Sequence, residues 1–420
     1  MPRKSFKYRL YPNQETEQTL CWTLDRAREL YNAGLTERRD AYNFHVRQHP
    51  NYYDKAIRKE LTKELAVNYS TQQNDLPEIK DELREEYQEI AAHVLQDVLR
   101  RLDKAFQNFF RRVREGASEP GYPRFKGHNR YNSFTYPDGA GWKLTVEEQG
   151  KKIKGTLHLS KIGNVKVIVH RKLEGKIKTC TIKREVDQWY VVFSCEVDTP
   201  EKLPLSYEDV GLDLGVSHLA TLSNGKMIEH PQYYRRGEKI LEKRQQELSQ
   251  KKKGSHRCKK AGRAQASAHR KIARQRRDFS HKASRKLVNT YQLIVFEDIK
   301  VGNLTKHAKP KQDETGKYLP NGAAAKGGLN KSILDAGWGM FVDMCSYKAA
   351  KAGRTLLKVS PKYTSQICSN CGTVKKKDLS ERWHSCDCGA ELDRDVNAAI
   401  NILERGRRQL GAISVEAPCL

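Results

Sequence analysis

Four cysteines place the strongest constraint on what this chain can fold into. Cys368 and Cys371 occur in CSNCG and Cys386 and Cys388 in CDCG, so each pair stands beside a glycine that lets the chain turn back. Four thiolates with this spacing fit one tetrahedral Zn²⁺ with Zn–S bonds of about 2.3 Å and leave no open coordination position. The sequence therefore predicts a structural zinc ribbon. The second pair is CxC where CxxC is commoner, so His384 stays an alternative ligand.

The charge of the chain indicates a polyanionic partner. It carries 78 Lys and Arg against 51 Asp and Glu, a formal net charge of +27. A compact fold with this excess repels itself unless a polyanion such as nucleic acid neutralises it. No apolar run has the length of a membrane span or of a secretory signal. Six of the ten cysteines are scattered singly, which is typical of thiols in a reducing compartment. We therefore expect a cytoplasmic protein without a membrane partner.

More than half of the excess charge lies between Lys251 and Lys286. This segment holds 15 Lys or Arg and one acid, Asp278. A helix that is positive all round is unstable unless a polyanion lies against it, and binding phosphates with so many cations makes affinity fall with salt. The alternative is a merely solvated charge run. The candidate phosphate contacts are Lys251, Lys252, Lys253, Lys259, Lys260, Arg263, Arg270, Arg274 and Arg277.

Three carboxylates stand where separate elements can bring them together. Asp213 lies in VGLDLG, a predicted buried strand, where an unpaired carboxylate is costly. Glu297 ends the apolar strand LIVF, and Asp395 begins the predicted helix of LDRDVNAAINIL. Together they could hold two Mg²⁺ or Mn²⁺ ions roughly 3.5 to 4 Å apart, which activate water and stabilise the leaving oxygen in phosphodiester hydrolysis. Taken singly, Asp393 and Asp395 could be helix caps and Glu297 an exposed strand end.

The periodicity of apolar residues predicts several domains. A strand at the amino terminus precedes helical segments, and alternating segments return from WKLTV to WYVVFSCEV, so the helices are expected to interrupt one β-domain. A β-meander is predicted from Val210, followed by polar helices and the buried strand LIVF. Residues 302–331 predict a long loop. Ser332 is predicted to cap a helix that Gly353 ends.

The motifs in their order carry a family likeness. GLDLG, VFEDI, SPKYTSQICSNCG and CDCGAELDRDVNAAINI resemble TnpB, the nuclease of IS200/IS605-type transposons and a relative of type V CRISPR effectors. FKYRLYPNQETEQTL, PGYPRFKG and DAGWGMF also look like family sequence, so the likeness spans nearly the whole chain. The CxC spacing is the one departure.

The resemblance implies a multidomain fold of α+β and α/β type. It implies a RuvC-like nuclease domain of RNase H fold with Asp213, Glu297 and Asp395 as catalytic metal ligands, and it makes Asp393 the weaker candidate. The expected domains are a wedge-type β-barrel (1–12 and 121–204), a helical recognition insertion (13–120), the RuvC-like nuclease domain (205–363 and 391–409), an inserted zinc ribbon (364–390) and a tail (410–420).

The implied activity is RNA-guided, metal-dependent cleavage of double-stranded DNA beside a short adjacent motif. The guide RNA would come from the transposon end, and base pairing would read the target while the protein holds the duplex by shape and charge. Matching VLQDVL and SFTYP to the family's motif-reading elements points to Gln96, Thr135 and Tyr136. We expect a prokaryotic, nucleoid-associated protein that is monomeric in its ribonucleoprotein.

Three other readings compete with this one. A regulator that binds guide RNA and DNA without cutting would need a broken carboxylate triad, and all three positions are filled. An RNase H-fold transposase would need a synaptic oligomer, and no dimerisation helix is evident in the sequence. A generic zinc-ribbon DNA-binding protein leaves the RuvC-like motifs unexplained.

Overall fold

The computed structural model describes residues 2–64, 67–128, 130–137, 139–149, 152–199, 201–376, 378 and 381–416. The chain forms two compact units, Met1–Thr199 and Pro200–Leu420. The last four residues of the predicted tail, 417–420, lie outside the described residues. The multidomain α+β class expected from the sequence is confirmed.

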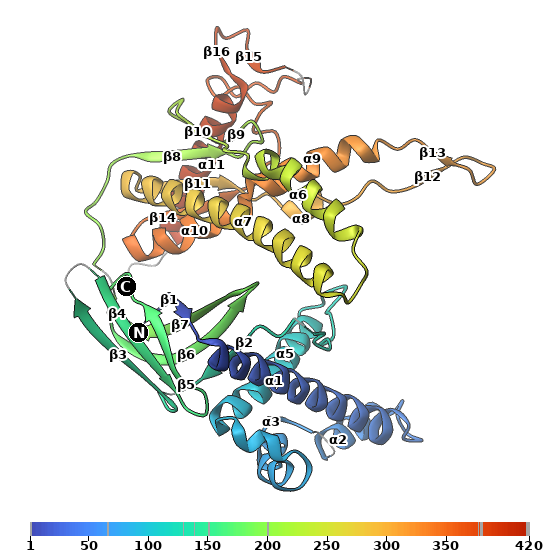
Figure 1. The fold of residues 1–420 in the computed structure, drawn as a ribbon. Coiled ribbons are helices and arrows are strands. Elements are labelled where there is room, and N and C mark those ends of the chain that lie inside the picture. Colours follow the sequence, from blue (N-terminus) through green and yellow to red (C-terminus); the bar gives the residue numbers. More distant parts are fainter. Residues whose placement is uncertain are drawn as a thin grey trace. The chain divides into compact units, whose positions relative to one another are not determined.

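The first unit is built on a seven-stranded antiparallel sheet with the order β2-β6-β7-β1-β5-β4-β3 (Figure 1). The strands form where apolar and polar residues alternate, because a pleated strand then buries one face against the core. They are β1 (Arg3–Tyr11), β2 (Ser133–Tyr136), β3 (Trp142–Gln149), β4 (Lys152–Leu159), β5 (Gly163–Ile168), β6 (Lys176–Glu185) and β7 (Gln188–Glu196).

This sheet must curl. β2 and β3 lie at its opposite edges, yet only residues 137–141 connect them. Six steps of extended chain span at most about 22 Å, whereas the edge strands of a flat seven-stranded sheet stand about 29 Å apart. The edges are therefore drawn together, which is the curvature that a barrel-like domain requires.

Helices fill the sequence between β1 and β2. The long α1 (Gln14–Ala41) begins at Asn13, whose side chain accepts a hydrogen bond from the Thr16 backbone N–H at 2.7 Å. It packs with α5 (Ala92–Arg114), whose buried residues recur at helical spacing. The shorter elements are η1 (Tyr42–Arg47), α2 (Lys55–Glu64), α3 (Tyr69–Asn74), α4 (Leu76–Glu78), η2 (Ile79–Leu83) and η3 (Glu85–Glu89).

The second unit is built on a five-stranded mixed sheet with the order β10-β9-β8-β11-β14. The three strands β8, β11 and β14 are parallel, while β9 is antiparallel to β8 and β10 to β9, as the predicted meander requires. The strands are β8 (Asp209–Asp213), β9 (His218–Leu222), β10 (Met227–Glu229), β11 (Leu293–Glu297) and β14 (Thr355–Val359).

Helices cover both faces of this sheet (Figure 1). Ile294 and Phe296 of β11 face a core that includes Phe341, while Leu293 and Val295 face the opposite cluster. This alternation explains why the strand reads as an uninterrupted apolar run, since a strand buried on both faces needs apolar residues at every position. The helices are α6 (Tyr233–Ser249), α7 (His256–Thr290), α8 (Val301–Leu304), α9 (Ala323–Ala336), α10 (Trp338–Ala352) and α11 (Arg394–Glu416).

Two expectations about the segment before α10 were wrong. Residues 302–331 are not one loop, because they include the hairpin of β12 (Lys311–Gln312) and β13 (Tyr318–Leu319) and most of α9. Ser332 lies inside α9 and does not cap a helix. The break comes at Gly337, whose φ of 67° suits glycine and ends α9 before α10 begins. Gly353 ends α10 as predicted.

None of the helices among the described residues has the length and apolar character that crossing a membrane requires.

Candidate active site

Asp213 and Glu297 end two neighbouring parallel strands. Phe296 of β11 pairs with Leu212 of β8, so the next residue of each strand stands at the same level. Adjacent strands lie about 4.8 Å apart, and partners in register point to the same face of the sheet. Both carboxylates therefore lie together at the carboxyl-terminal edge of the sheet, on the face covered by α11.

Two glycines allow α11 to lie directly on these strands. A Cβ atom built on Gly211 of β8 would stand 2.1 Å from the Ala399 carbonyl oxygen of α11. One built on Gly406 of α11 would stand 2.4 Å from a methyl carbon of Val295 on β11. No real Cβ atom is tolerated at such distances, so each glycine is required for the helix to reach the sheet. This close approach positions the first turn of α11, where Asp395 lies.

We predict that Gly211→Ala displaces α11 and reduces cleavage more than it reduces overall folding. The added methyl group has no room between β8 and α11, and overpacking typically costs 1–3 kcal/mol. The matched control is Gly302→Ala, since nothing lies within 4 Å of a Cβ atom at Gly302. Thermal unfolding and DNA cleavage of both variants would be measured, and a Gly211→Ala protein with wild-type cleavage would show that the close approach is not needed.

Asp393 and Asp395 have different roles. The Asp393 carboxylate accepts hydrogen bonds from the backbone N–H groups of Asp395 at 2.8 Å and Val396 at 3.1 Å, so it caps α11. The Asp395 carboxylate takes no part in this cap. One of its oxygens lies 3.5 Å from Nε of the largely buried Arg394. The sequence alone could not separate the two acids.

The charges of the neighbouring acids act on Asp213. Burial raises the pKa of Asp213 well above its ordinary range, and the negative charges of Glu297 and Asp395 raise it further. Arg394 acts in the opposite direction. Burial also raises the pKa of Glu297, although the Thr364 hydroxyl donates a hydrogen bond to its carboxylate at 2.5 Å. The three acids are half-buried, and a divalent metal ion bound between them would offset their negative charge.

Among the described residues, the four cysteines come together as a compact group of potential metal ligands. Their sulfur atoms all lie within 4.8 Å of one another. Cys368 and Cys388 are 3.7 Å apart and Cys371 and Cys386 3.6 Å, which matches the edge of about 3.8 Å that a tetrahedron with 2.3 Å bonds requires. The donor set therefore fits one Zn²⁺. His384 on β15 (Trp383–Ser385) is fully buried and is not part of the sulfur group.

Two asparagines that the sequence analysis missed connect α11 to the ribbon. The Asn397 amide donates to the Ile367 carbonyl at 2.7 Å, and its oxygen accepts from the Ser369 N–H at 2.9 Å. Asn401 donates to the carbonyls of Thr364 and Ile367. The sequence NAAIN could have indicated these contacts. Two polar residues four positions apart lie on the same face of a helix, and when that face is buried they require hydrogen-bond partners. Residues 364–369, which lead into the first cysteine pair, are thus held by the helix that carries Asp395.

The basic segment forms a loop and most of α7. Lys251, Lys252 and Lys253 lie in the turn before the helix, while α7 buries one side through residues such as Ile272 and Leu287. Its cations are therefore not distributed all round the helix. All of the candidate phosphate contacts are exposed except Arg270, which is half-buried.

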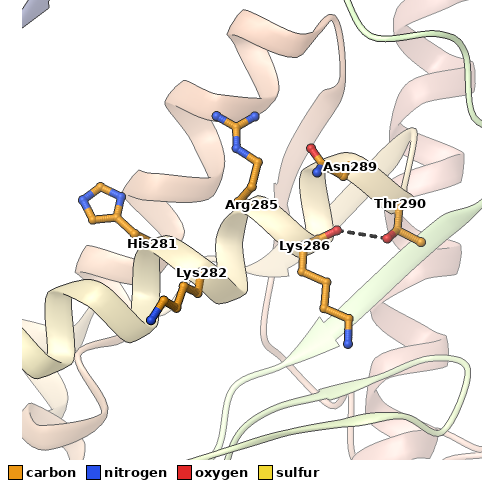
Figure 2. A pocket seen from close by; sticks show the side chains of 6 residues that line it. All are labelled: His281, Lys282, Arg285, Lys286, Asn289 and Thr290. Carbon is orange, nitrogen blue, oxygen red and sulfur yellow. Dashed lines mark hydrogen bonds between the residues drawn. The ribbon is translucent and has the colours of Figure 1, made fainter. Parts of the chain in front are cut away.

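The end of α7 presents more cations around a hollow of about 560 Å³ (Figure 2). Lys282 and Lys286 extend in one direction and Arg285 in the other. Lys282 is paired with Asp278 at 2.6 Å. This part of the surface can receive an anionic backbone.

The three residues matched to motif reading all belong to the first unit, but two of them are buried. Tyr136 is 1% exposed, and its hydroxyl donates to the Ser160 carbonyl at 2.9 Å. The Thr135 hydroxyl accepts a hydrogen bond from Arg101 of α5. Gln96 of α5 is half-buried. Arg101 thereby connects α5 to β2, and contact of Tyr136 with DNA would require its side chain to leave the core.

Three sequence families match parts of the chain. The family described as "Probable transposase" matches residues 192–308, "Cas12f1-like, TNB domain" matches residues 338–402, and "Helix-turn-helix domain" matches residues 1–45. The second match spans α10, the ribbon and the start of α11. In the structure, residues 1–45 contain β1 and one long helix, so they do not form two helices joined by a turn.

Relatives of named function cover most of the chain. A "Putative RNA-guided DNA endonuclease" from Streptomyces pristinaespiralis is 34% identical over 417 residues, covering 96% of this chain and 89% of the relative. "Putative RNA-guided DNA endonuclease InsQ" from Escherichia coli K12 is 34% identical over 318 residues, 75% of each chain. "TnpB-like protein L79" of Acanthamoeba polyphaga mimivirus is 28% identical over 152 residues, 36% of this chain and 27% of that protein.

The fold is similar to that of the mini-RNA-guided endonuclease CRISPR-Cas_phi3, with a TM-score of 0.52, 9% identity and coverage of 96% of this chain and 92% of that one. Together, the families and relatives define the class as transposon-associated proteins that act on DNA. The chain belongs to the TnpB family of transposon-encoded, RNA-guided DNA endonucleases.

Proposed function

We propose that this chain cuts double-stranded DNA next to a short adjacent motif, using Asp213, Glu297 and Asp395 to hold two Mg²⁺ or Mn²⁺ ions. The observation that supports this most is geometric: Asp213 and Glu297 end neighbouring parallel strands on the face that α11 covers, and Asp395 lies in the first turn of that helix. Like charges gathered in a half-buried group are costly unless cations neutralise them. Parallel strands that end in these acids, with α11 on the same face, are what a RuvC-like domain of RNase H fold requires.

The residues around the acids support hydrolysis of a phosphodiester. The carboxylates would hold the metal ions, which activate water and stabilise the leaving oxygen when bound. Thr364 orients Glu297 through its hydrogen bond, and Asp393 holds the first turn of α11. We expect the four cysteines to hold a structural Zn²⁺ and to take no part in the chemistry, since four thiolates fill its coordination sphere.

A guide RNA from the transposon end is the proposed source of sequence specificity. The protein would act as a monomer in the ribonucleoprotein, with the exposed cations of α7 on the backbone of the guide–target duplex. Motif reading by Gln96, Thr135 and Tyr136 remains a prediction. A silent regulator is the weaker alternative, because the three acids are present and adjacent.

The test of this function uses the ribonucleoprotein as purified, with its RNA sequenced. A DNA duplex matching that RNA should be cut in Mg²⁺ and left intact after chelation or after removal of the RNA. Binding without cutting in Mg²⁺ and in Mn²⁺ would support the silent regulator. Specific cutting by RNA-free protein would contradict guidance.

We predict that replacing Lys251, Lys252, Lys253, Lys259 and Lys260 with Gln weakens duplex binding about equally for all sequences. Each lost phosphate contact should reduce the salt slope of log affinity by about one, because fewer counterions are released. Binding and cleavage of matched and mismatched targets would be measured over a salt series. A changed target preference would refute the proposed role in holding phosphates.

A further inference from the structure

The first unit contains a cavity of about 470 Å³ that the proposed function does not use. It lies where the end of α1 and η1 meet α5 and the segment around Tyr122. Its size is typical of sites that enclose a small organic group.

Five aromatic rings line this cavity: Tyr42, Phe106, Phe109, Phe110 and Tyr122. The ring centroids of Phe106 and Phe109 lie 5.5 and 5.3 Å from that of Tyr122, both nearly edge-on. Phe110 is 55% exposed although it borders the cavity. A planar apolar group entering the cavity would therefore find ring faces and edges to pack against.

Arg38 is one of the polar residues of the cavity wall, with Thr62, Asn68, Asp103 and Gln107. Its side chain is 6% exposed, its Nε donates to Gln72 at 2.9 Å and its Nη1 donates to Asp103 at 3.0 Å. Among the described residues, nothing accepts a hydrogen bond from the buried Nη2. The guanidinium carbon lies 5.2 Å from the centroid of the Phe106 ring, so Arg38 holds this aromatic side of the cavity in place.

The charges favour a neutral ligand inside the cavity and an anion outside. Asp103 neutralises Arg38 within the wall and would repel a phosphate there. The hydrogen bond with Tyr52 raises the pKa of Tyr42, while the charges of Arg58 and Arg47 act in the opposite direction. Arg58 also lies over the Tyr52 ring, 5.4 Å from its centroid. Arg39 is paired with Asp40 at 2.9 Å, so its charge is partly neutralised.

We propose that this cavity receives an unstacked nucleobase of the bound nucleic acid. The base would pack against the aromatic rings, while its phosphates would lie near Arg47 and Arg58. The proposal rests on the proposed function for the presence of nucleic acid, but it does not require the nuclease site. Stacking of one base on aromatic side chains corresponds to about 5- to 150-fold in affinity.

The test is ultraviolet crosslinking of the full ribonucleoprotein, followed by mass spectrometry of the peptides. We expect a nucleotide attached to a peptide that contains Tyr42, Phe106 or Tyr122. A crosslink formed with copurified RNA alone would identify an RNA base, and one that appears only with matching target DNA would identify a DNA base.

Variants make the test independent of cleavage. We test two variants: Phe110→Ala removes one of the aromatic rings, and Ala41→Phe fills the cavity. Each should remove the crosslink and weaken nucleic-acid binding by about 5- to 150-fold. Tyr53→Ala is the matched control, because this ring is 91% exposed and does not line the cavity. Unchanged thermal unfolding would show that both variants fold.

The outcomes separate this proposal from the proposed function. A ribonucleoprotein that cuts matched DNA, gives no crosslink at the cavity and binds equally well as Phe110→Ala would overturn the base site alone. A protein that binds no nucleic acid at all would overturn both.

Discussion

Each of the substitutions Asp213→Ala, Glu297→Ala and Asp395→Ala is expected to reduce DNA cleavage by at least about a thousandfold while leaving guide and target binding nearly unchanged. Metal ions contribute several kcal/mol to stabilising the transition state, and each 1.36 kcal/mol is tenfold in rate. Asp213 and Glu297 end neighbouring strands, and the charges of Glu297 and of Asp395 on α11 add to the effect of burial in raising the pKa of Asp213. Removal of any one should therefore weaken metal binding at the whole group.

The matched control for these variants is Asp298→Ala. Asp298 follows Glu297 directly, but its side chain is 41% exposed and it pairs with Lys300 at 2.6 Å. It should cut at close to the wild-type rate. Cleavage would be followed on a duplex matching the copurified RNA, and binding by gel shift with the same duplex. If one of the three acid variants cut as fast as the control, its residue would not be a catalytic ligand.

Loss of the zinc site is the second large effect that we expect. Purified protein should contain about one zinc per chain, and Cys368→Ser or Cys386→Ser should reduce this to nearly none. Structural zinc binding is worth about 10–16 kcal/mol in small zinc-binding peptides, so the ribbon should lose its fold. Cleavage should also fall, because Asn397 and Asn401 connect the carbonyls of Ile367 and Thr364, just before the first cysteine pair, to the helix of Asp395.

Metal analysis by mass spectrometry would check the zinc prediction. Cys258→Ser is the control, since this cysteine belongs to α7 and is outside the sulfur group. A zinc-free wild-type protein would refute the ribbon. Full zinc content in Cys388→Ser would instead favour His384 as a ligand, against the sulfur geometry.

The sequence could predict the site because its chemistry is local to short motifs. The apolar runs around Asp213 and Glu297 predicted strands, and each acid stands at the end of its strand. The four cysteines are close together along the chain, so their clustering in space needed little knowledge of the fold.

The contacts that align these elements could not be predicted in the same way. Gly211 and Gly406 are nearly 200 residues apart in the sequence, and only the packing of α11 shows that both are needed. A central glycine in a strand does signal a close backbone approach, but the sequence does not identify the partner. α9 was missed because Ala-rich sequence interrupted by Gly327 and Gly328 lacks a periodic apolar face. The burial of Tyr136 follows from the register of β2 with β6.

The most direct test of the central claim is to reprogram the guide. The copurified RNA would be replaced by one that differs only in the segment complementary to the target, and cleavage of two duplexes with the same flanking motif would be compared. We predict that the cut moves to the duplex matching the new RNA and that the original duplex is left intact. Cleavage that stays on the original duplex, or that ignores the RNA, would contradict the account.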